Sequence, residues 1–284
     1  MKTFIQALSA STVVFTFGCA HAIQQQPSKP EITASAQRQS VTVFLREATG
    51  TQLGSGVLVG SGIGGYWIVT NRHVVQQQQQ LCVVGADKKA IAGLVLPARK
   101  GKFSKDLDLA LVFLPRTSKE PFKLAPLASQ PVNTRLLPIV HSTGYPTPLK
   151  TNPDGPPYSE NEGLLLPLLK NPLEGGFDLA YTSGVQKGMS GGGVFIGGEL
   201  IGINGTHANP LWPGQWRDQR GKAVDEQLNN KLELVSLGIS ADVIRAELKD
   251  AAVPGSEHLR ILSGVDCNPS SNEATVKKVS QRSW

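Results

Sequence analysis

Residues 188–204 read GMSGGGVFIGGELIGIN and place one serine, Ser190, inside a run of glycines. Glycine has no β-carbon, so such a run lets the backbone adopt positive φ and lets another group approach the N–H groups closely. Two short apolar segments follow, 194–196 and 199–204, separated by Gly197-Gly198. The pattern predicts a strand, a tight turn and a second strand directly after the serine.

The rest of the chain carries the same kind of pattern in two successive sets. Short apolar or β-branched stretches bounded by glycine or polar clusters predict about six strands in each half. Between the halves, residues 115–132 carry four prolines, a spacing that no central strand or helix accommodates. No amphipathic helix separates the strands, so a βαβ architecture is excluded and an all-β sandwich or barrel is expected. The predicted strands are 40–46, 52–59, 66–70, 81–84, 90–96 and 108–114, then 136–141, 163–169, 177–182, 193–196, 199–204 and 232–238.

The composition favours turns over long helices, since the 284 residues include 30 Gly and 19 Pro and only 6% are aromatic. The formal net charge is +6, but the 28 Lys and Arg residues are spread along the chain without interleaved aromatic residues. Nucleic-acid binding is therefore not expected. Residues 145–163 hold five prolines, and we expect a long surface loop there.

Residues 1–22 have the features of an export signal. Lys2 is followed by an uncharged stretch and then by Ala20-His21-Ala22, with small residues where a signal peptidase cleaves. The stretch is too short and too polar to span a bilayer, and no later segment reaches that length. We therefore expect an exported protein, periplasmic or secreted, with lipoprotein processing at Cys19 as a minor alternative. Residues 23–39 lack an apolar period and are predicted as a linker.

Removal of the signal leaves two cysteines, Cys82 and Cys267. An oxidising compartment permits a disulfide between them, and two unpaired thiols are the equal alternative. The sequence contains no CxxC pair, no HExxH motif and no Cys/His cluster with ligand spacing. Neither a metal nor a cofactor is expected.

Two further patterns place a polar residue at the end of a strand. The predicted strand 66–70 runs into Asn71-Arg72-His73, which presents a histidine where the strand stops. Asp108 begins the apolar segment 108–113, and a carboxylate there must face water or find a buried partner. Taken alone, each residue is more often structural than catalytic.

Taken in the order His73, Asp108 and Ser190, these motifs resemble the chymotrypsin-like serine peptidases. The resemblance is to the bacterial trypsin-like peptidases with T-x-x-H-V, D-L-A-L and G-M-S-G-G-P, and it also covers Gly54-Ser55-Gly56 before the histidine. It implies an all-β chymotrypsin-like fold of two Greek-key six-stranded β-barrels. The implied organisation is a barrel over 40–114, a connector over 115–132, a second barrel over 133–238, a short C-terminal helix over 239–253 and a polar tail over 254–284.

The resemblance implies a catalytic role for each of the three residues. His73 would be the general base that takes the proton of Ser190, and Asp108 would orient the imidazole, with Asp106 as the alternative carboxylate. The N–H groups of Gly188 and Ser190 would stabilise the oxyanion. The expected activity is that of a serine endopeptidase, which hydrolyses a polypeptide substrate through an acyl-enzyme intermediate.

The resemblance also suggests which residues bind substrate. Gly184 would form the floor of the first specificity pocket, where an enzyme that cleaves after Arg or Lys has an acidic residue, so that preference is not expected. Lys187 and His207 would lie near the pocket mouth and favour an acidic side chain, or would lie on the surface without such a role. Asn204 and Gly205 are the remaining candidates for substrate contact.

The chain departs from the family pattern at two positions, and two other functions remain open. Gly193 stands where the family commonly has proline, and Asn204 where close relatives often have histidine. The motif over 188–192 also fits the G-x-S-x-G of α/β-hydrolases, with His207 or His258 as base, although that elbow requires a helix after the serine. A catalytically silent binding protein with the same fold is the other alternative.

Overall fold

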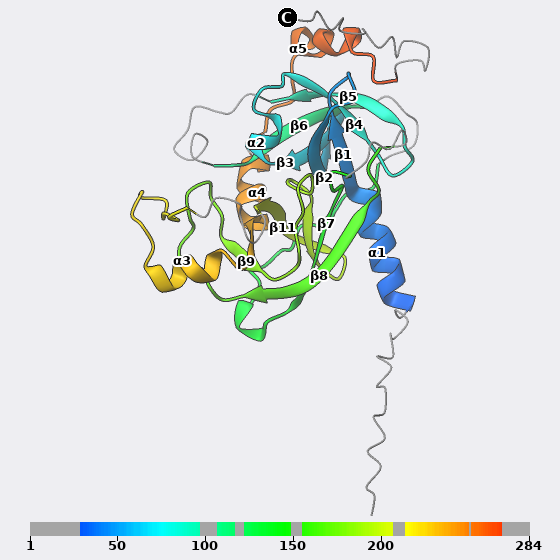
Figure 1. Cartoon of the computed structure of the whole chain (residues 1–284). Coiled ribbons are helices and arrows are strands. Elements are labelled where there is room, and N and C mark those ends of the chain that lie inside the picture. The colour runs from blue at the N-terminus through cyan, green and yellow to red at the C-terminus, as the bar shows by residue number, and fades with distance from the viewer. Residues whose placement is uncertain are drawn as a thin grey trace, which may run out of the picture.

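The computed structural model describes residues 29–96, 107–116, 122–148, 155–206, 214–249 and 251–268. These residues form two closed β-barrels of six antiparallel strands each. Figure 1 shows the barrels one above the other, the first in blue and cyan and the second in green and yellow. The prediction of an all-β, chymotrypsin-like fold is confirmed, and an α/β-hydrolase is excluded because Ser190 leads into a strand of an antiparallel barrel.

The first barrel has the strand order β1-β2-β3-β6-β5-β4, and the pairing of β1 with β4 closes it. Since β3 pairs with β6 rather than with β4, the connection is a Greek key. Buried Val, Leu and Ile side chains from these strands fill the barrel. The strands are β1 (Thr42–Arg46), β2 (Gln52–Gly62), β3 (Gly65–Thr70), β4 (Gln80–Val84), β5 (Ala90–Val95) and β6 (Ala110–Pro115).

The second barrel repeats this arrangement in the order β10-β11-β12-β9-β8-β7, and the pairing of β10 with β7 closes it. Its core contains Val140, Leu165, Tyr181, Val194 and Ile201. The strands are β7 (Ile139–Gly144), β8 (Ser159–Leu166), β9 (Leu179–Tyr181), β10 (Gly193–Ile196), β11 (Glu199–Thr206) and β12 (Ser236–Ser240).

Every predicted strand overlaps an observed one. The largest differences at a strand start are four residues, in β8, which begins at Ser159 instead of residue 163, and in β12, which begins at Ser236 instead of residue 232 because residue 232 ends a helix. The polar first half of β8 pairs with β7 through the backbone, as at Glu162 and His141. Backbone pairing does not require apolar side chains, so hydrophobic patterning cannot detect it.

Side chains from both barrels and from α4 (Ala241–Lys249) form one hydrophobic cluster at the barrel junction. Val57 and Trp67 come from the first barrel, Ile203 from the second and Ile244 from α4. The helix lies inside the range 239–253 where the sequence predicts one. Burial of its apolar face therefore holds α4 against the barrels.

The predicted linker over 23–39 is wrong for residues 29–39, because α1 (Lys29–Val41) is helical. The helix has no apolar stripe for a periodicity search to find. It is held instead by a fully buried arginine, Arg38, which donates hydrogen bonds to the second barrel at Glu160 and at the carbonyl of Gly197. Tertiary contacts of this kind decide whether a helix forms when its local pattern is weak.

The predicted polar tail over 254–284 is also partly ordered. It contains α5 (Ser256–Arg260) and a 3₁₀ turn, η2 (Ile261–Gly264), and a disulfide joins Cys267 to Cys82 of β4. Of the two alternatives for these cysteines, the structure has the disulfide. The bond crosses 185 residues of sequence, so local pattern cannot reveal it.

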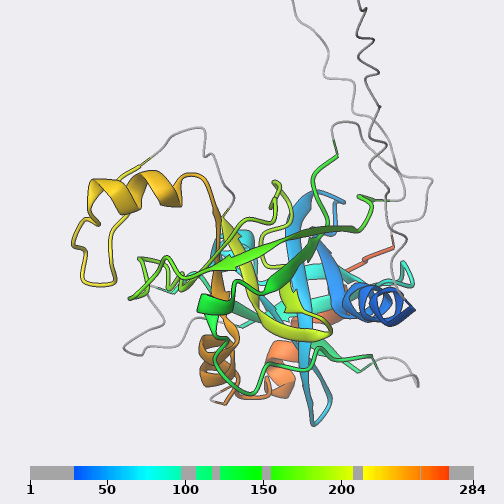
Figure 2. The same ribbon diagram turned by 90° about the horizontal axis from the view of Figure 1, so that it is seen from below.

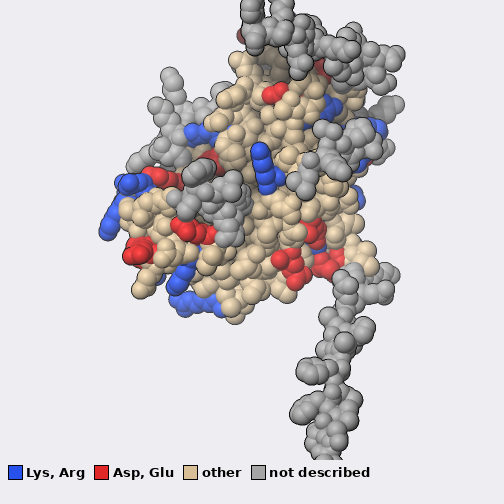
Figure 3. All heavy atoms as spheres, viewed as in Figure 1, with Lys and Arg blue, Asp and Glu red and all other residues tan. Residues whose placement is uncertain are grey.

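The remaining helices are short, namely α2 (Arg72–Val75), η1 (Thr134–Leu136) and α3 (Glu226–Leu232). Asp225 caps α3 by accepting a hydrogen bond from the N–H of Leu228. Figure 2 shows α1 and α3 on opposite sides of the barrels. None of the described helices is both long and apolar enough to pass through a membrane. On the face seen in Figure 3, Lys and Arg are interspersed with Asp and Glu.

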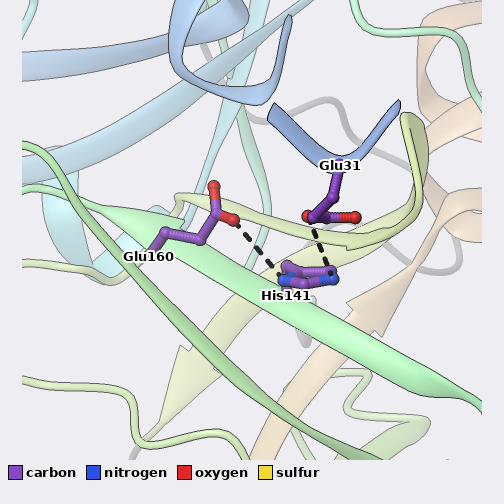
Figure 4. A group of neighbouring side chains, drawn as sticks. All are labelled: Glu31, His141 and Glu160. Carbon is purple, nitrogen blue, oxygen red and sulfur yellow. Dashed lines mark ion pairs between the residues drawn. The ribbon is translucent and has the colours of Figure 1, made fainter. Parts of the chain in front are cut away.

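A compact charge cluster anchors α1 to the second barrel (Figure 4). Arg38 pairs with Glu31 of α1 and with Glu160 of β8. The ring of His141 on β7 lies between the same carboxylates, with Nδ1 3.4 Å from Glu160 and Nε2 3.8 Å from Glu31. Burial alone would raise the pKa of Glu160, but hydrogen bonds from Arg38 and Tyr158 and the nearby charges outweigh burial and lower the pKa.

We expect Arg38→Met to lower the free energy of unfolding by about 3 kcal/mol, because it leaves two carboxylates without their buried partner. The pKa of Glu160 is lower in the folded chain than in the unfolded chain. Its stabilisation is therefore complete above the ordinary carboxyl pKa of about 4.3 and is lost as pH falls through the folded value. Denaturant unfolding at neutral and acid pH measures both effects, and the acid dependence should shrink in the variant.

Arg217→Met removes an exposed arginine whose side chain, among the described residues, bonds only the nearby carbonyl of Gly221, and the variant should stay within about 0.5 kcal/mol of the wild type. Equal stability of Arg38→Met and the wild type at pH 7 would contradict the anchoring role.

Candidate functional site

The candidate site lies where a loop of the second barrel meets β2 of the first. The Ser55 N–H donates a 2.9 Å hydrogen bond to the carbonyl of Ser190, which ties the glycine-rich loop to the strand. Nearby, the N–H of Asp108 donates to the carbonyl of Gly175 at 2.8 Å. Backbone bonds between the barrels thus flank the three residues singled out from the sequence.

His73 lies in α2, a single helical turn that follows β3. Buried Val74 and Val75 hold this turn against the barrel. The imidazole Nδ1 lies 2.7 Å from Oδ2 of Asp108, and the His73 N–H donates to Oδ1 of the same carboxylate at 2.9 Å. The His73 side chain is 47% exposed and that of Asp108 17%. One carboxylate therefore fixes both the backbone and the ring of a solvent-accessible histidine.

Strand pairing explains why these two residues meet although they are 35 positions apart. Thr70, the last residue of β3, pairs with Ala110, the first residue of β6. The antiparallel pair therefore places the exit of β3, with His73, beside the entry of β6, with Asp108. Buried Asn71 adds a hydrogen bond from Nδ2 to the carbonyl of Asp108, at 3.0 Å.

Ser190 lies in a loop whose backbone conformation requires glycine at positions 188 and 191. Gly188 has φ +94° and Gly191 has φ +81°, in the left-handed region. A β-carbon on Gly188 would lie 2.6 Å from the carbonyl oxygen of Tyr145, and Gly191 packs as closely on Thr70 and Ser55. Space as well as φ therefore accounts for the glycine run.

The hydroxyl of Ser190 donates a 3.4 Å hydrogen bond to the carbonyl of Gly205. Within the described ranges, no hydrogen bond joins it to His73. Both the serine loop and the residue after His73 lie against Gly54 of β2, where a β-carbon would lie 2.9 Å from the Val74 side chain and 3.1 Å from the Ser190 carbonyl oxygen. The structure thus brings His73 and Asp108 into direct contact and places Ser190 and Val74 against the same glycine.

The N–H groups of the glycine-rich run 188–193 are held by hydrogen bonds, with two exceptions, and further bonds hold carbonyls of the run and of Lys187. Those bonds run from Thr147 N to Lys187 O, Ser55 Oγ to Gly188 O, Met189 N to Gln186 O, Gly192 N to Met189 O, Ser55 N to Ser190 O and Gly191 N to Asn204 O. Within the run 188–193, the exceptions are the N–H groups of Gly188 and Ser190, neither of which donates a hydrogen bond to any residue that the structure describes; the N–H groups of Gln186 and Lys187, just before the run, do not donate one either. The run therefore presents two free donors among hydrogen-bonded neighbours.

The residues expected to bind substrate have different surroundings. A β-carbon on Gly184 would meet nothing within 4 Å, and the Gly184 carbonyl accepts a hydrogen bond from Asn161 Nδ2. Lys187 is exposed, and Gly205 presents its carbonyl to Ser190. Asp106 and His207 lie outside the described residues.

Asn204 is fully buried, so its side chain is not available to a substrate. Its Nδ2 donates to the carbonyls of Thr143 and Met189, and its Oδ1 accepts from the hydroxyl of Tyr181. We therefore assign Asn204 to support of the serine loop. Gly193, the other departure from the family pattern, donates its N–H to Thr143 Oγ1 at 3.1 Å, a bond that proline could not form.

Ser55, which bonds Gly188 and Ser190 of the serine loop, is not among the candidate site residues predicted from the sequence. It enters that prediction only as part of the motif Gly54-Ser55-Gly56. A serine between glycines inside an otherwise apolar strand is the available signal, because a buried hydroxyl needs a partner.

Glu31, His141 and Glu160 are residue types that bind metals, and their ligand atoms lie within 4.8 Å of one another. Arg38, however, bonds the same Oε1 atoms of both glutamates that face the histidine. A cation at this place would have to displace a buried guanidinium, so the donor set does not fit a metal.

Comparison with known proteins supports the fold and identifies a family. The family model described as "Trypsin-like peptidase domain" matches residues 54–203. The solved serine endoprotease from Yersinia pestis is 18% identical, with a TM-score of 0.54 over 79% of this chain and 67% of that one. No curated protein matches. Because the family model spans more than half of the 284 residues, this chain belongs to the trypsin-like peptidase domain family.

Proposed function

We propose that this protein is a serine endopeptidase with His73, Asp108 and Ser190 as its catalytic triad. The observation that carries the proposal is the His73–Asp108 pair, in which one carboxylate bonds both the ring and the backbone of the histidine. An ionised carboxylate only accepts hydrogen bonds, so the proton lies on Nδ1 and Nε2 keeps its lone pair. Membership of a peptidase family supports a polypeptide as the substrate.

In the proposed first step, His73 Nε2 takes the hydroxyl proton of Ser190 while Oγ attacks the carbonyl carbon of the substrate. Ser190 would leave its 3.4 Å bond to Gly205 by rotating about Cα–Cβ. That bond is long, and catalytic hydrogen bonds often form fully only in the substrate complex. Collapse of the tetrahedral intermediate breaks the C–N bond, and the amine leaves with the proton from His73. Water then attacks the acyl-enzyme, with His73 again as base, and restores Ser190.

The two free N–H groups of the loop would stabilise the negative oxygen of the intermediate. Gly188 and Ser190 are the two residues of the run 188–193 whose N–H groups donate no hydrogen bond to a described residue, whereas Met189, Gly191, Gly192 and Gly193 each donate one. Donors that are already fixed need no reorganisation during the reaction, and one such donor contributes about 3 kcal/mol in comparable sites.

For specificity, we propose a first pocket at Gly184 that does not select Arg or Lys. The loop from 184 to 190 contains no carboxylate, and its one charged residue is Lys187. Open space beside Gly184 and the amide of Asn161 at its carbonyl support a neutral pocket floor.

For location, we propose export after cleavage at Ala22. The signal-like residues 1–22 and Cys19 lie outside the described residues. The disulfide between Cys82 and Cys267 supports an oxidising compartment, where such bonds persist.

Ser190→Ala and His73→Ala should each reduce hydrolysis of a fluorogenic peptide at least about 10⁴-fold, because the nucleophile and its base act as a unit. Asp108→Asn should cost a similar factor, since an amide at this position favours the wrong tautomer. Steady-state kinetics and labelling by a fluorophosphonate probe measure these losses.

Ser263→Ala removes a hydroxyl whose one bond to the part of the chain that the structure describes is to the nearby carbonyl of Arg260, and it should keep wild-type activity. Turnover by Ser190→Ala at the wild-type rate would refute the triad. A folded wild type that neither reacts with the probe nor cleaves any peptide would favour the silent binding protein.

A peptide-library profile of the wild type should show no strong selection for Arg or Lys before the cleaved bond. Gly184→Asp, which has room for its side chain, should raise kcat/KM for Arg and Lys peptides relative to neutral ones by about tenfold, as 1.4 kcal/mol of charge pairing predicts. Strong Arg or Lys selection by the unchanged protein would overturn the pocket assignment.

Intact-mass analysis of protein recovered from its native compartment should find a chain that begins at Ile23. Its mass should increase by two hydrogens on reduction, as one disulfide requires. A chain that begins at a lipid-modified Cys19 would favour the lipoprotein alternative, and an uncleaved Met1 would contradict export.

A further inference from the structure

Ser55 makes four hydrogen bonds from a fully buried position in β2. Its N–H donates to the Ser190 carbonyl at 2.9 Å, and its carbonyl accepts from Thr70 Oγ1 at 2.7 Å. Its hydroxyl donates to the Gly188 carbonyl at 2.8 Å and accepts from the Tyr145 N–H at 2.9 Å. One residue of the first barrel therefore bonds Gly188 and Ser190, the two residues of the run 188–193 whose N–H groups donate no hydrogen bond to a described residue.

The hydroxyl of Ser55 bonds the carbonyl of the Gly188–Met189 peptide group. The N–H end of this group donates to Gln186, so the serine supplies the bond at the other end. Gly188 is at φ +94° and has no side chain to restrict rotation. Bonds at both ends of this peptide group restrict its rotation, and its orientation bears on the direction of the neighbouring Gly188 and Ser190 N–H groups.

The surroundings leave no substitute for this hydroxyl. A β-carbon on Gly144 would lie 3.0 Å from Ser55 Oγ and 2.8 Å from Met189 Cα, so the space between β7 and the loop is filled. Without the hydroxyl, the carbonyl of Gly188 and the N–H of Tyr145 would both lose a partner in a buried setting. The Gly188 carbonyl and the Tyr145 N–H would then regain a hydrogen-bond partner only if the serine loop changed its conformation.

We propose that Ser55 is a positioning residue that aligns the Gly188 and Ser190 N–H groups for the oxyanion. The inference rests on the proposed function of the same site. The hydroxyl belongs to the first barrel and the loop to the second, so the oxyanion donors are aligned by a contact between barrels. The Tyr145 N–H fixes the hydroxyl because it occupies the acceptor side of Oγ and directs the proton to Gly188.

The test compares the wild type, Ser55→Ala and Ser55→Thr on one fluorogenic peptide that the wild type cleaves. In Ser55→Ala, kcat should fall about tenfold to thirtyfold, less than the roughly 100-fold or greater loss of a whole donor, while KM stays within about twofold. A trifluoromethyl ketone of the same peptide, which forms the tetrahedral adduct, should lose affinity in proportion to kcat/KM. The corresponding peptide alcohol, which forms no adduct, should bind within about twofold of its wild-type affinity. Ser55→Thr keeps the hydroxyl and should recover most of the lost kcat.

Tyr66→Phe is the matched control, because it removes a hydroxyl from a buried residue of the same barrel away from the loop. Its kcat and ketone affinity should equal those of the wild type. Thermal unfolding confirms that each variant is folded at the assay temperature, and Ser55→Cys, whose thiol is a weak donor, replaces Ser55→Ala if the latter unfolds.

Wild-type kcat and ketone affinity in the folded variant that lacks the serine hydroxyl would overturn the positioning role. Equal losses for the ketone and the alcohol would overturn it too, since they indicate general damage to the pocket. The proposed function would survive both results, because it depends on the inactivity of Ser190→Ala and not on Ser55.

Discussion

The hydrogen bond from the Ser55 N–H to the Ser190 carbonyl joins the two barrels at the loop that carries the serine. It requires the backbones of β2 and of the loop to lie in contact, and a side chain at Gly54, Gly188 or Gly191 would prevent this. The glycines therefore act through close approach as much as through conformational freedom. With the loop packed on β2, hydrogen bonds hold the peptide groups around the serine. The N–H groups of Gly188 and Ser190 donate no hydrogen bond to the described residues.

The His73–Asp108 pair has a separate origin, in the topology of the first barrel. The pairing of β3 with β6 places the end of one strand beside the start of the other, so a residue just after β3 meets a residue just before β6. The same Greek-key order returns in the second barrel, which supplies the serine loop between β9 and β10. Neither barrel contains the whole site. The relative placement of the barrels, held by the shared hydrophobic cluster and α4, therefore determines whether the three side chains can work together.

The strands were predictable because burial leaves a short apolar run in the sequence, as in β3, which is buried throughout, and in β6, whose central residues are buried. The helix α1 was not, because it is stabilised by Arg38 reaching Glu160 across 122 positions rather than by an apolar stripe. The ordered part of the tail depends in the same way on a disulfide between residues far apart in sequence. The polar start of β8 was missed because its stability comes from backbone pairing, which any side chain allows. Each of these three differences arises where a distant partner stabilises a segment whose local sequence is uninformative.

Local sequence alone determined the strand periodicity, the glycine run around Ser190 and the polar residues at strand ends, because these features reflect short-range backbone geometry and burial. Family resemblance then connected His73, Asp108 and Ser190. Only the tertiary structure decided that Asn204 is a buried support, that Arg38 occupies the ligand atoms of a metal-like cluster, and that Ser55 bonds the serine loop. These outcomes depend on which hydrogen-bond partners come into contact in the folded chain. Long-range packing determines those contacts, and they cannot be predicted from the composition or periodicity of one segment.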